Sequence, residues 1–218
     1  MKLNIYIETF CKLDNVKRPE EKLRGYIGNK YIDNTIFHNH NNSNFYYRYP
    51  LVQYKSFNKK LIVIGINEGA NVLKKVLEEE KNINLLADEY NLNFNEKVEA
   101  CYAFGCVNNL IKYKFITPWI ALSQKNIKLY EEANEEEKQE LLKRILIGNI
   151  ISMSKTLGYT VDRELKCEIN LVEKRSILKG IKFISFLGTF KINFYIPSYL
   201  GLGKSVSKGF GTVKNLLN

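Results

Sequence analysis

The first hundred residues carry strand and helix signals in the order strand, helix, strand, strand, helix, strand. Apolar and polar residues alternate from Leu3 to Thr9, which is the period of a half-buried strand. Pro19 and two glutamates open a helix that continues through Ile27 and Tyr31, and a second helix begins near Glu68. The order βαββαβ is that of the split βαβ, or ferredoxin-like, fold.

Two strands are expected between these helices, from Phe45 to Tyr54 and from Lys60 to Asn67, around a turn at residues 56–59. Pro50 indicates an edge or a bulge in the first of them. Several asparagines between residues 34 and 44 end the first helix in a polar loop. A strand from Glu96 to Phe104 completes the unit.

The second half of the chain repeats the strand and helix signals of the first half less regularly. Four segments carry its signals: a helix at 135–157 and strands at Tyr113–Ile116, Arg163–Val172 and Ile184–Ile196. Gly188 is expected to bend or divide the last strand, and residues 105–112 are the best place for a linker. The fold class is therefore α+β, with two ferredoxin-like domains in tandem at residues 1–106 and 107–218, the second irregular.

Composition excludes two broad classes. With 218 residues, of which 45% are hydrophobic, the chain can bury a core and is not a disordered protein. Uncharged runs such as Ile145–Ser154 are too short to cross a membrane, and the first residues lack the apolar block of a secretory signal. We therefore expect a soluble, cytoplasmic protein with no membrane partner.

The net charge of +10 is concentrated at the two ends. Residues 1–60 hold 11 Lys and Arg against 5 Asp and Glu, residues 160–218 hold 10 against 4, and residues 61–159 hold 12 against 14, giving +6, +6 and −2. Basic ends that converge on one face would attract a nucleic acid backbone. Generic solubility charge, or an AT-rich genome that inflates lysine, is the alternative.

The four cysteines lie in no C-x-x-C pair and far from both histidines, so neither a zinc site nor a disulfide framework is indicated. Apolar surroundings such as Ala100–Tyr102 favour reduced, packed thiols. The acids at Glu131–Glu132 and Glu135–Glu137 are typical of a solvated helix start rather than of a metal site. No metal or other cofactor is expected.

Both histidines of the chain, His38 and His40, lie in the loop after the first helix. Two imidazoles two residues apart can act as base and acid on one substrate near neutral pH, which is what cleavage of RNA by its own 2′-hydroxyl requires. Lys30 and Arg48 are candidate cations for the phosphate in the transition state. Exposed loop histidines without a role, or a metal-binding H-x-H, are the alternatives.

A glycine-rich loop near the C-terminus contains two Gly-apolar-Gly units around two lysines and two serines. It fits neither the Walker loop nor the dinucleotide fingerprint. Glycines let main-chain amides approach an anion, and the lysines and serines add charge and donors, so we expect a phosphate-binding loop. A flexible turn near a chain end is the alternative. Its expected RNA-binding residues are Gly201, Gly203, Lys204, Ser205, Ser207, Lys208, Gly209 and Gly211.

Together, these features resemble the CRISPR-associated endoribonucleases that process repeat-containing precursor RNA into guides. The segments Leu23–Lys30 and Tyr46–Lys55 are similar to the subtype-b branch, and the resemblance spans nearly the whole chain. It implies two ferredoxin-like domains, with the glycine-rich loop helping to hold CRISPR repeat RNA. It also implies metal-independent cleavage that leaves a 2′,3′-cyclic phosphate and a 5′-hydroxyl.

The resemblance implies His38 and His40 as the catalytic pair, with Lys30 and Tyr47 in support. As a cation beside this loop, Arg48 is expected among the RNA-binding residues. Glycine-loop proteins of the same superfamily include subunits that hold guide RNA without cutting it, so a non-catalytic RNA-binding subunit of an effector complex is the alternative function. Other effector subunits, or a second copy of the chain, are the further partners to consider.

Overall fold

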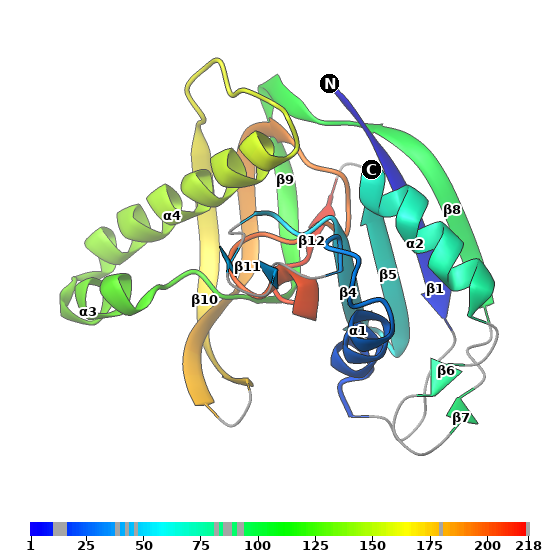
Figure 1. Cartoon of the computed structure of the whole chain (residues 1–218). Helices are drawn as coiled ribbons and strands as arrows, with labels where there is room; N and C mark the ends of the chain where they lie inside the picture. Colours follow the sequence, from blue (N-terminus) through cyan, green and yellow to red (C-terminus); the bar gives the residue numbers. More distant parts are fainter. Residues whose placement is uncertain are drawn as a thin grey trace. The chain divides into compact units, whose positions relative to one another are not determined.

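The structure is a computed structural model of the whole chain (Figure 1). It describes residues 1–10, 17–37, 40–41, 44–45, 48–80, 83–84, 89–90, 94–178 and 181–216. The chain divides into two compact units. One holds residues 2–102 with Ser207–Gly209, and the other holds Met1 with residues 103–206 and 210–218.

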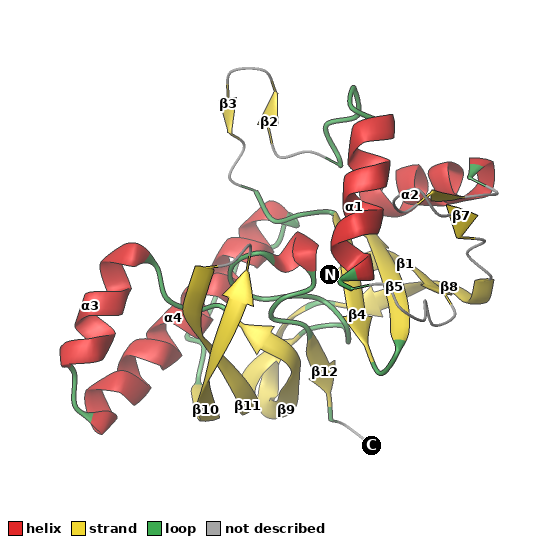
Figure 2. Cartoon of the chain, turned by 90° about the horizontal axis from the view of Figure 1, so that it is seen from below, coloured by secondary structure: helices red, strands yellow, loops and turns green. Residues whose placement is uncertain are grey.

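The N-terminal unit has the predicted βαββαβ order. Its elements are β1 (Lys2–Phe10), α1 (Pro19–Lys30), β4 (Val52–Phe57), β5 (Lys60–Ile66), α2 (Glu68–Glu79) and β8 (Phe94–Ala103). The sheet order is β4-β5-β1-β8, with β1 antiparallel to β5 and β5 antiparallel to β4. The first and third strands of the motif therefore lie in the centre, as in a ferredoxin-like fold, and α1 and α2 cover one face of the sheet (Figure 2).

The helix-covered face of this sheet carries the unit's core. Leu23 and Ile27 of α1 and Leu73 of α2 are fully buried against strand residues such as Val63. Residues 61–64 of β5 are at most 5% exposed, so this central strand is buried on both of its faces. Continuous apolar strands of this kind are typical of a strand without a solvated face.

The β4–β5 hairpin closes at the predicted turn. Phe57 pairs with Lys60, and both residues between them, Asn58 and Lys59, have positive φ angles of 49° and 59°. Positive φ at both central positions is the geometry of a type I′ turn, whose twist matches that of the strands. The predicted strand start at Phe45 is wrong, because β4 begins only at Val52.

Two short hairpins complete the described part of this unit. The first pairs β2 (His40–Asn41) with β3 (Asn44–Phe45), and the second pairs β6 (Ile83–Asn84) with β7 (Glu89–Tyr90).

The C-terminal unit repeats the same strand order with one helix missing. Its elements are β9 (Gly105–Trp119), α3 (Gln124–Glu132), α4 (Glu135–Thr156), β10 (Cys167–Leu178), β11 (Ile181–Tyr195) and β12 (Val213–Asn215). The sheet order is β10-β11-β9-β12. A loop that contains the short helix η1 (Val206–Lys208) stands where the second helix of the motif would be. The prediction of an irregular second domain is confirmed.

An aromatic core fills this unit between sheet and helices. Phe115 and Trp119 stack with ring centroids 5.3 Å apart, and Phe190 lies 5.1 Å from Phe115. All three are at most 1% exposed. The Trp119 indole donates to Asn149 of α4 over 3.1 Å, which satisfies its buried N–H.

The start of α4 explains the acidic run. Asn134 and Glu137 form a capping box, with the Asn134 side chain accepting from the Glu137 amide and the Glu137 carboxylate accepting from the Asn134 amide. Glu135–Glu137 form the first turn, where carboxylates favour the helix dipole. The helix-start interpretation is confirmed for these three, whereas Glu131–Glu132 end α3, a helix that the sequence pattern did not predict.

The structure also bears on the predictions for residues 105–112, Gly188 and the cysteines. Residues 105–112 are no linker, because they form the first half of β9. Gly188 has φ 139° at a register shift between β11 and β9, so it bends one continuous strand, as one of the two predicted outcomes. The prediction of a packed thiol is wrong for Cys101 of β8, which is exposed. Cys106 and Cys167 are half-buried, and Cys11 lies outside the described residues. Within the described part of the chain, no helix combines the length and apolar character needed to cross a membrane.

Candidate functional site

The histidine loop is only partly described. His38 and Tyr47 lie outside the described residues. His40 lies in β2, in register with Phe45 of β3, so its backbone belongs to a short hairpin after α1. The structure thus describes the two segments that enter and leave this loop, residues 31–37 and 48–50.

The segment that leads into the loop is held by a chain of turns. Tyr31 caps α1, because its backbone amide donates a hydrogen bond to the Ile27 carbonyl oxygen. The Asn34 amide donates to the Tyr31 carbonyl, and the Phe37 amide donates to the Asn34 carbonyl. Phe37 is 7% exposed, and its ring lies 6.0 Å from that of Tyr31. The residue immediately before His38 is therefore anchored in the core of the N-terminal unit.

Arg48 joins the two segments. Its guanidinium donates to the carbonyl oxygen of Thr35 over 2.7 Å, across the base of the histidine loop. A hydrogen bond from a charged donor is stronger than a neutral one. In the structure, Arg48 therefore closes the loop that holds both histidines.

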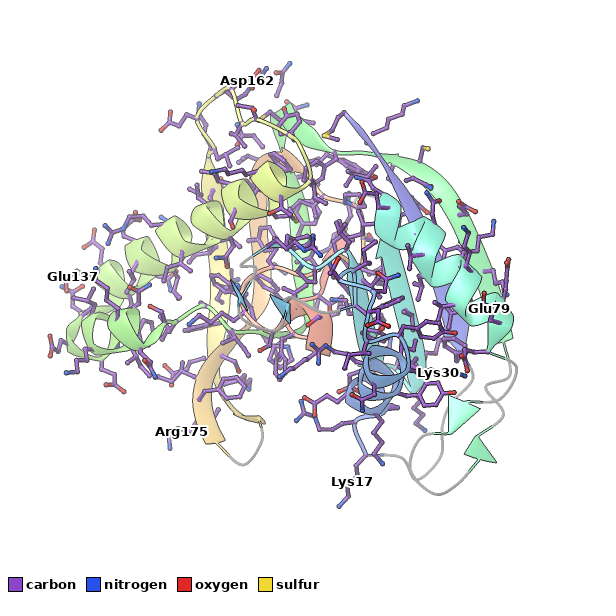
Figure 3. The ribbon with its side chains drawn as sticks, viewed as in Figure 1. Lys17, Lys30, Glu79, Glu137, Asp162 and Arg175 are labelled. Carbon is purple, nitrogen blue, oxygen red and sulfur yellow. The ribbon has the colours of Figure 1, made fainter. Side chains whose placement is uncertain are left out.

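Lys30, the predicted supporting cation, ends α1 and is ion-paired. Its ammonium lies 2.7 Å from a carboxylate oxygen of Glu80, which directly follows α2, and 3.4 Å from the Tyr26 hydroxyl. Figure 3 labels Lys30 at the end of α1 and Glu79 at the end of α2. The Lys30 side chain is 51% exposed and that of Glu80 only 3%.

Glu80 is the acceptor at the centre of this network. The hydroxyl of Tyr31 donates to it over 2.7 Å and that of Tyr26 over 2.8 Å. Burial raises the pKa of Glu80, but the hydrogen bonds from Lys30, Tyr31 and Tyr26 lower it more, so the pKa lies below its ordinary value. Burial, followed by the bond to Glu80, raises the pKa of Tyr31. Lys30, Tyr26, Tyr31 and Glu80 are called the Glu80 network below.

The glycine-rich loop is bonded into the C-terminal unit through much of its backbone. The amides of Leu202 and Gly211 donate to carbonyls at Gly211 and Pro118, and the Lys204 amide donates to Ile120. Gly203 has φ 85°, and a Cβ there would lie 2.5 Å from the Trp119 indole nitrogen. Close packing therefore explains this glycine.

The prediction that main-chain amides of the loop meet an anion needs correction for Lys204 and Gly211. Their amides already donate within the chain, so the Lys204 side chain, which is exposed, is the group that remains to meet an anion there. Ser205 has φ 56° and is half-buried, as are Ser207 and Lys208. The RNA-binding role of the loop stays a prediction.

Ser207, Lys208 and Gly209 belong to the N-terminal unit. A Cβ at Gly209 would lie 3.2 Å from the Tyr54 carbonyl oxygen and 3.7 Å from the Cα of Lys55, so this part of the loop lies along β4. The Lys55 side chain beside it is fully buried, and burial lowers its pKa to about 7.

Sequence reasoning missed both Glu80 and Lys55. Glu80 stands in a run of acids that reads as the exposed end of a helix, and Lys55 follows the alternation of a strand with one polar face. Only contacts between distant segments, such as those of Glu80 with Lys30 and Tyr31 and of Gly209 with Lys55, distinguish these residues from ordinary surface charges. Among the described residues, no group of three His, Cys, Asp or Glu side chains could hold a metal ion.

Two consecutive ferredoxin-like units are a fold that this chain shares with solved CRISPR-associated proteins. A solved structure described as Cas6b matches 99% of this chain and all of the other, with 40% sequence identity and a TM-score of 0.90. A second, described as the CRISPR RNA processing endoribonuclease Cas6b, covers the same shares with 37% identity and a TM-score of 0.78.

Family models give the particular family. The Cas6b N-terminal domain matches residues 1–100, and the Cas6b C-terminal domain matches residues 105–216. The chain belongs to the Cas6b family. An uncharacterized protein of Methanocaldococcus jannaschii is 56% identical over 113 residues, which are 50% of this chain and 76% of that protein.

Proposed function

We propose that this chain is an endoribonuclease that cleaves CRISPR repeat RNA within precursor transcripts. The observation that carries the proposal is the similarity, over 99% of the chain, to a protein solved as a CRISPR RNA processing endoribonuclease. Family membership in both halves supports it, and so does the positive charge at the two ends of the sequence, which suits a polyanionic substrate.

The proposed chemistry is metal-independent acid-base catalysis by His38 and His40. One imidazole takes the proton of the 2′-hydroxyl, and the 2′-oxygen attacks the adjacent phosphorus. The bond from phosphorus to the 5′-oxygen breaks, and the second imidazole gives that oxygen a proton. The products are a 2′,3′-cyclic phosphate and a 5′-hydroxyl. Histidine suits both roles because its pKa lies near neutral pH.

Supporting roles fall to residues around the loop. Tyr47 and Lys30 are proposed to assist at the phosphate. The Lys30 side chain is half-exposed to solvent, and its ammonium is paired with Glu80. Arg48 is proposed as an RNA contact in addition to its bond with Thr35. The glycine-rich loop is proposed to hold the repeat through Gly201, Gly203, Lys204, Ser205, Ser207, Lys208, Gly209 and Gly211.

Mass analysis of the cleaved ends tests the reaction class. The protein is incubated with a repeat RNA in excess EDTA, and the fragments are weighed. A 2′,3′-cyclic phosphate on one fragment and a 5′-hydroxyl on the other are expected. Fragments that appear only after a divalent metal is restored, or that carry a 5′-phosphate, would refute the mechanism.

A 2′-deoxy nucleotide at the cleavage position separates the enzyme from a binding subunit. An enzyme of the proposed type binds this RNA as tightly as the unmodified RNA and does not cut it. A binding subunit binds both and cuts neither. Recovery of intact, unmodified RNA from the wild-type protein would therefore favour the binding subunit.

A further inference from the structure

Four lysines lie side by side on one face of the C-terminal sheet. Lys112 and Lys114 belong to β9, Lys191 to β11 and Lys214 to β12. The strand register places Lys191 directly opposite Lys112, and Lys214 directly opposite Lys114. Directly opposite residues have Cβ atoms about 4.5–5.5 Å apart. All four side chains are exposed, and they are called the lysine face below.

The lysine face is the side of the sheet away from the helices. The alternate residues Tyr113, Phe115, Phe190 and Val213 are at most 1% exposed and point to the other side, where Tyr130 of α3 and Asn149 of α4 meet the same core. Figure 2 shows α3 and α4 together on that other side of β9–β12. The pleat of the strands therefore separates an aromatic core from a basic, open surface.

The charge of this face is poorly neutralised. Glu168 of β10 lies directly opposite Lys191 and pairs with it at 2.8 Å. Within the described part of the chain, no ion pair reaches Lys112, Lys114 or Lys214. Like charges directly opposite each other destabilise a sheet, so this arrangement costs stability unless a polyanion compensates it.

We propose that the lysine face binds the phosphate backbone of RNA, as a surface additional to the histidine loop and the glycine-rich loop. The inference rests on the proposed RNA substrate. Sheet faces that read RNA bases do so by stacking them on aromatic side chains of the central strands. Here the outward positions of the central strands β9 and β11 in these rows are the exposed Lys112, Lys114 and Lys191 and the half-buried Thr189, and none is aromatic.

The chemistry of the face therefore sets what it recognises. Lysine ammonium groups contact phosphates as point charges, and the Thr189 hydroxyl and the Asn170 amide, which share a row with Lys114, can donate to phosphate oxygens. Contacts of this kind carry no base information. The lysine face should hold RNA of any sequence, while selectivity for the repeat resides elsewhere.

The test is the salt dependence of RNA binding. The variant Lys112→Gln/Lys114→Gln/Lys214→Gln and the wild type are titrated with repeat RNA carrying the 2′-deoxy block, at several KCl concentrations. Loss of three contacts to single-stranded RNA should flatten the slope of log Kobs against log salt by about 2, and raise Kd about 10- to 100-fold at about 0.1 M salt. A blocked RNA of unrelated sequence and equal length should show the same change in slope.

A matched control removes the same charge from the helix side of this unit. Lys125, Lys128 and Lys155 of α3 and α4 are exposed, and their triple change to Gln should leave the slope within about 0.5 of the wild type. Thermal melting should show the lysine-face variant to be folded and no less stable, because opposed like charges are gone. Equal slopes for the two triple variants would overturn the proposal and point to an acidic protein as the partner of this face.

Single-turnover cleavage of unmodified RNA separates this inference from the proposed function. At protein concentrations below saturation, the lysine-face variant should cut more slowly, in proportion to its weaker binding, whereas the helix-side control variant should cut at the wild-type rate. If the wild type never cuts repeat RNA but the salt slope falls as expected, the proposed function fails and the lysine face stands. If the wild type cuts and the slope does not change, the lysine face fails alone.

Discussion

The ammonium of Lys30 lies 2.7 Å from the buried carboxylate of Glu80, and this pair joins the end of α1 to the end of α2. Tyr31, the cap of α1, donates to the same carboxylate. The chain then runs through Phe37, anchored in the core, to the histidine loop. The Glu80 network thus fixes the end of α1, from which the chain leads into the loop that contains both proposed catalytic histidines.

Replacing Glu80 by Gln should destabilise the protein. The amide keeps an acceptor for one tyrosine but loses the charge that Lys30 and both hydroxyls meet, and disrupting a buried, charged hydrogen-bond acceptor costs about 1–3 kcal/mol. Denaturant unfolding of Glu80→Gln measures this. Glu79→Gln is the control, because Glu79 is exposed and accepts only a 3.3 Å bond from Tyr31. Equal loss in the two variants would show that Glu80 has no special role.

The Glu80 network also predicts a pH dependence. The folded protein holds the pKa of Glu80 below its ordinary value, so the unfolded chain takes up the proton first as the pH falls. The stabilisation by Glu80 is therefore complete above the ordinary glutamate pKa of about 4.3 and is lost as the pH falls below it. The stability difference between wild type and Glu80→Gln should shrink on acidification, and a constant difference from pH 7 to pH 3 would contradict this.

Removing either proposed catalytic imidazole should slow cleavage without weakening binding. His38→Ala and His40→Ala are each expected to lower the single-turnover rate by about 10²- to 10⁴-fold, the usual contribution of an acid-base group. If the two act as a pair, the double variant should be only slightly slower than each single one. Filter binding of blocked RNA should give Kd values near that of the wild type. Cleavage at the normal rate by the double variant would remove the site.

A methyl group at Gly203 should destabilise the C-terminal unit. Gly203 has φ 85°, and its Cβ would lie 2.5 Å from the Trp119 indole nitrogen and 2.7 Å from the Ile120 carbonyl oxygen. Strain at such a backbone position alone costs about 1–3 kcal/mol. Gly148→Ala in α4 is the control, since no atom lies within 4 Å and alanine should stabilise that helix by about 0.5–1 kcal/mol. Thermal unfolding should shift in opposite directions for the two variants.

Buried Lys55 should make stability depend on pH in the alkaline range. Burial lowers its pKa to about 7 in the folded protein, against about 10.4 in the unfolded chain. Between these values the unfolded state binds more protons, so stability rises with pH, by at most about 1.4 kcal/mol per pH unit. Lys55→Met should abolish this rise between pH 7 and pH 10, as measured by urea unfolding. An unchanged rise in the variant would show that Lys55 is not its source.

Local periodicity explains why the N-terminal unit was predictable. Alternation in β1, a proline-glutamate start to α1 and a two-residue turn at Asn58–Lys59 are signals written within a few neighbouring residues. The C-terminal unit was less so. Residues 105–112 alternate weakly because apolar Leu110 is exposed and polar Asn109 directly follows polar Asn108. The helix α3 is too short and too polar to stand out before α4.

The candidate site divides in the same way. The residue types of the histidine loop and the glycine-rich loop are visible in the sequence, because each loop gathers its imidazoles or its glycines and lysines within a few neighbouring residues. By themselves, the amino acids determined an α+β chain of tandem ferredoxin-like units, and they predicted acid-base and phosphate-binding chemistry for its loops. Only the tertiary structure decided that Glu80 and Lys55 are buried and that the amides of Lys204 and Gly211 donate within the chain. It also decided that lysines of three strands share one face of the sheet. These depend on contacts between segments far apart in the chain, which local propensity does not encode.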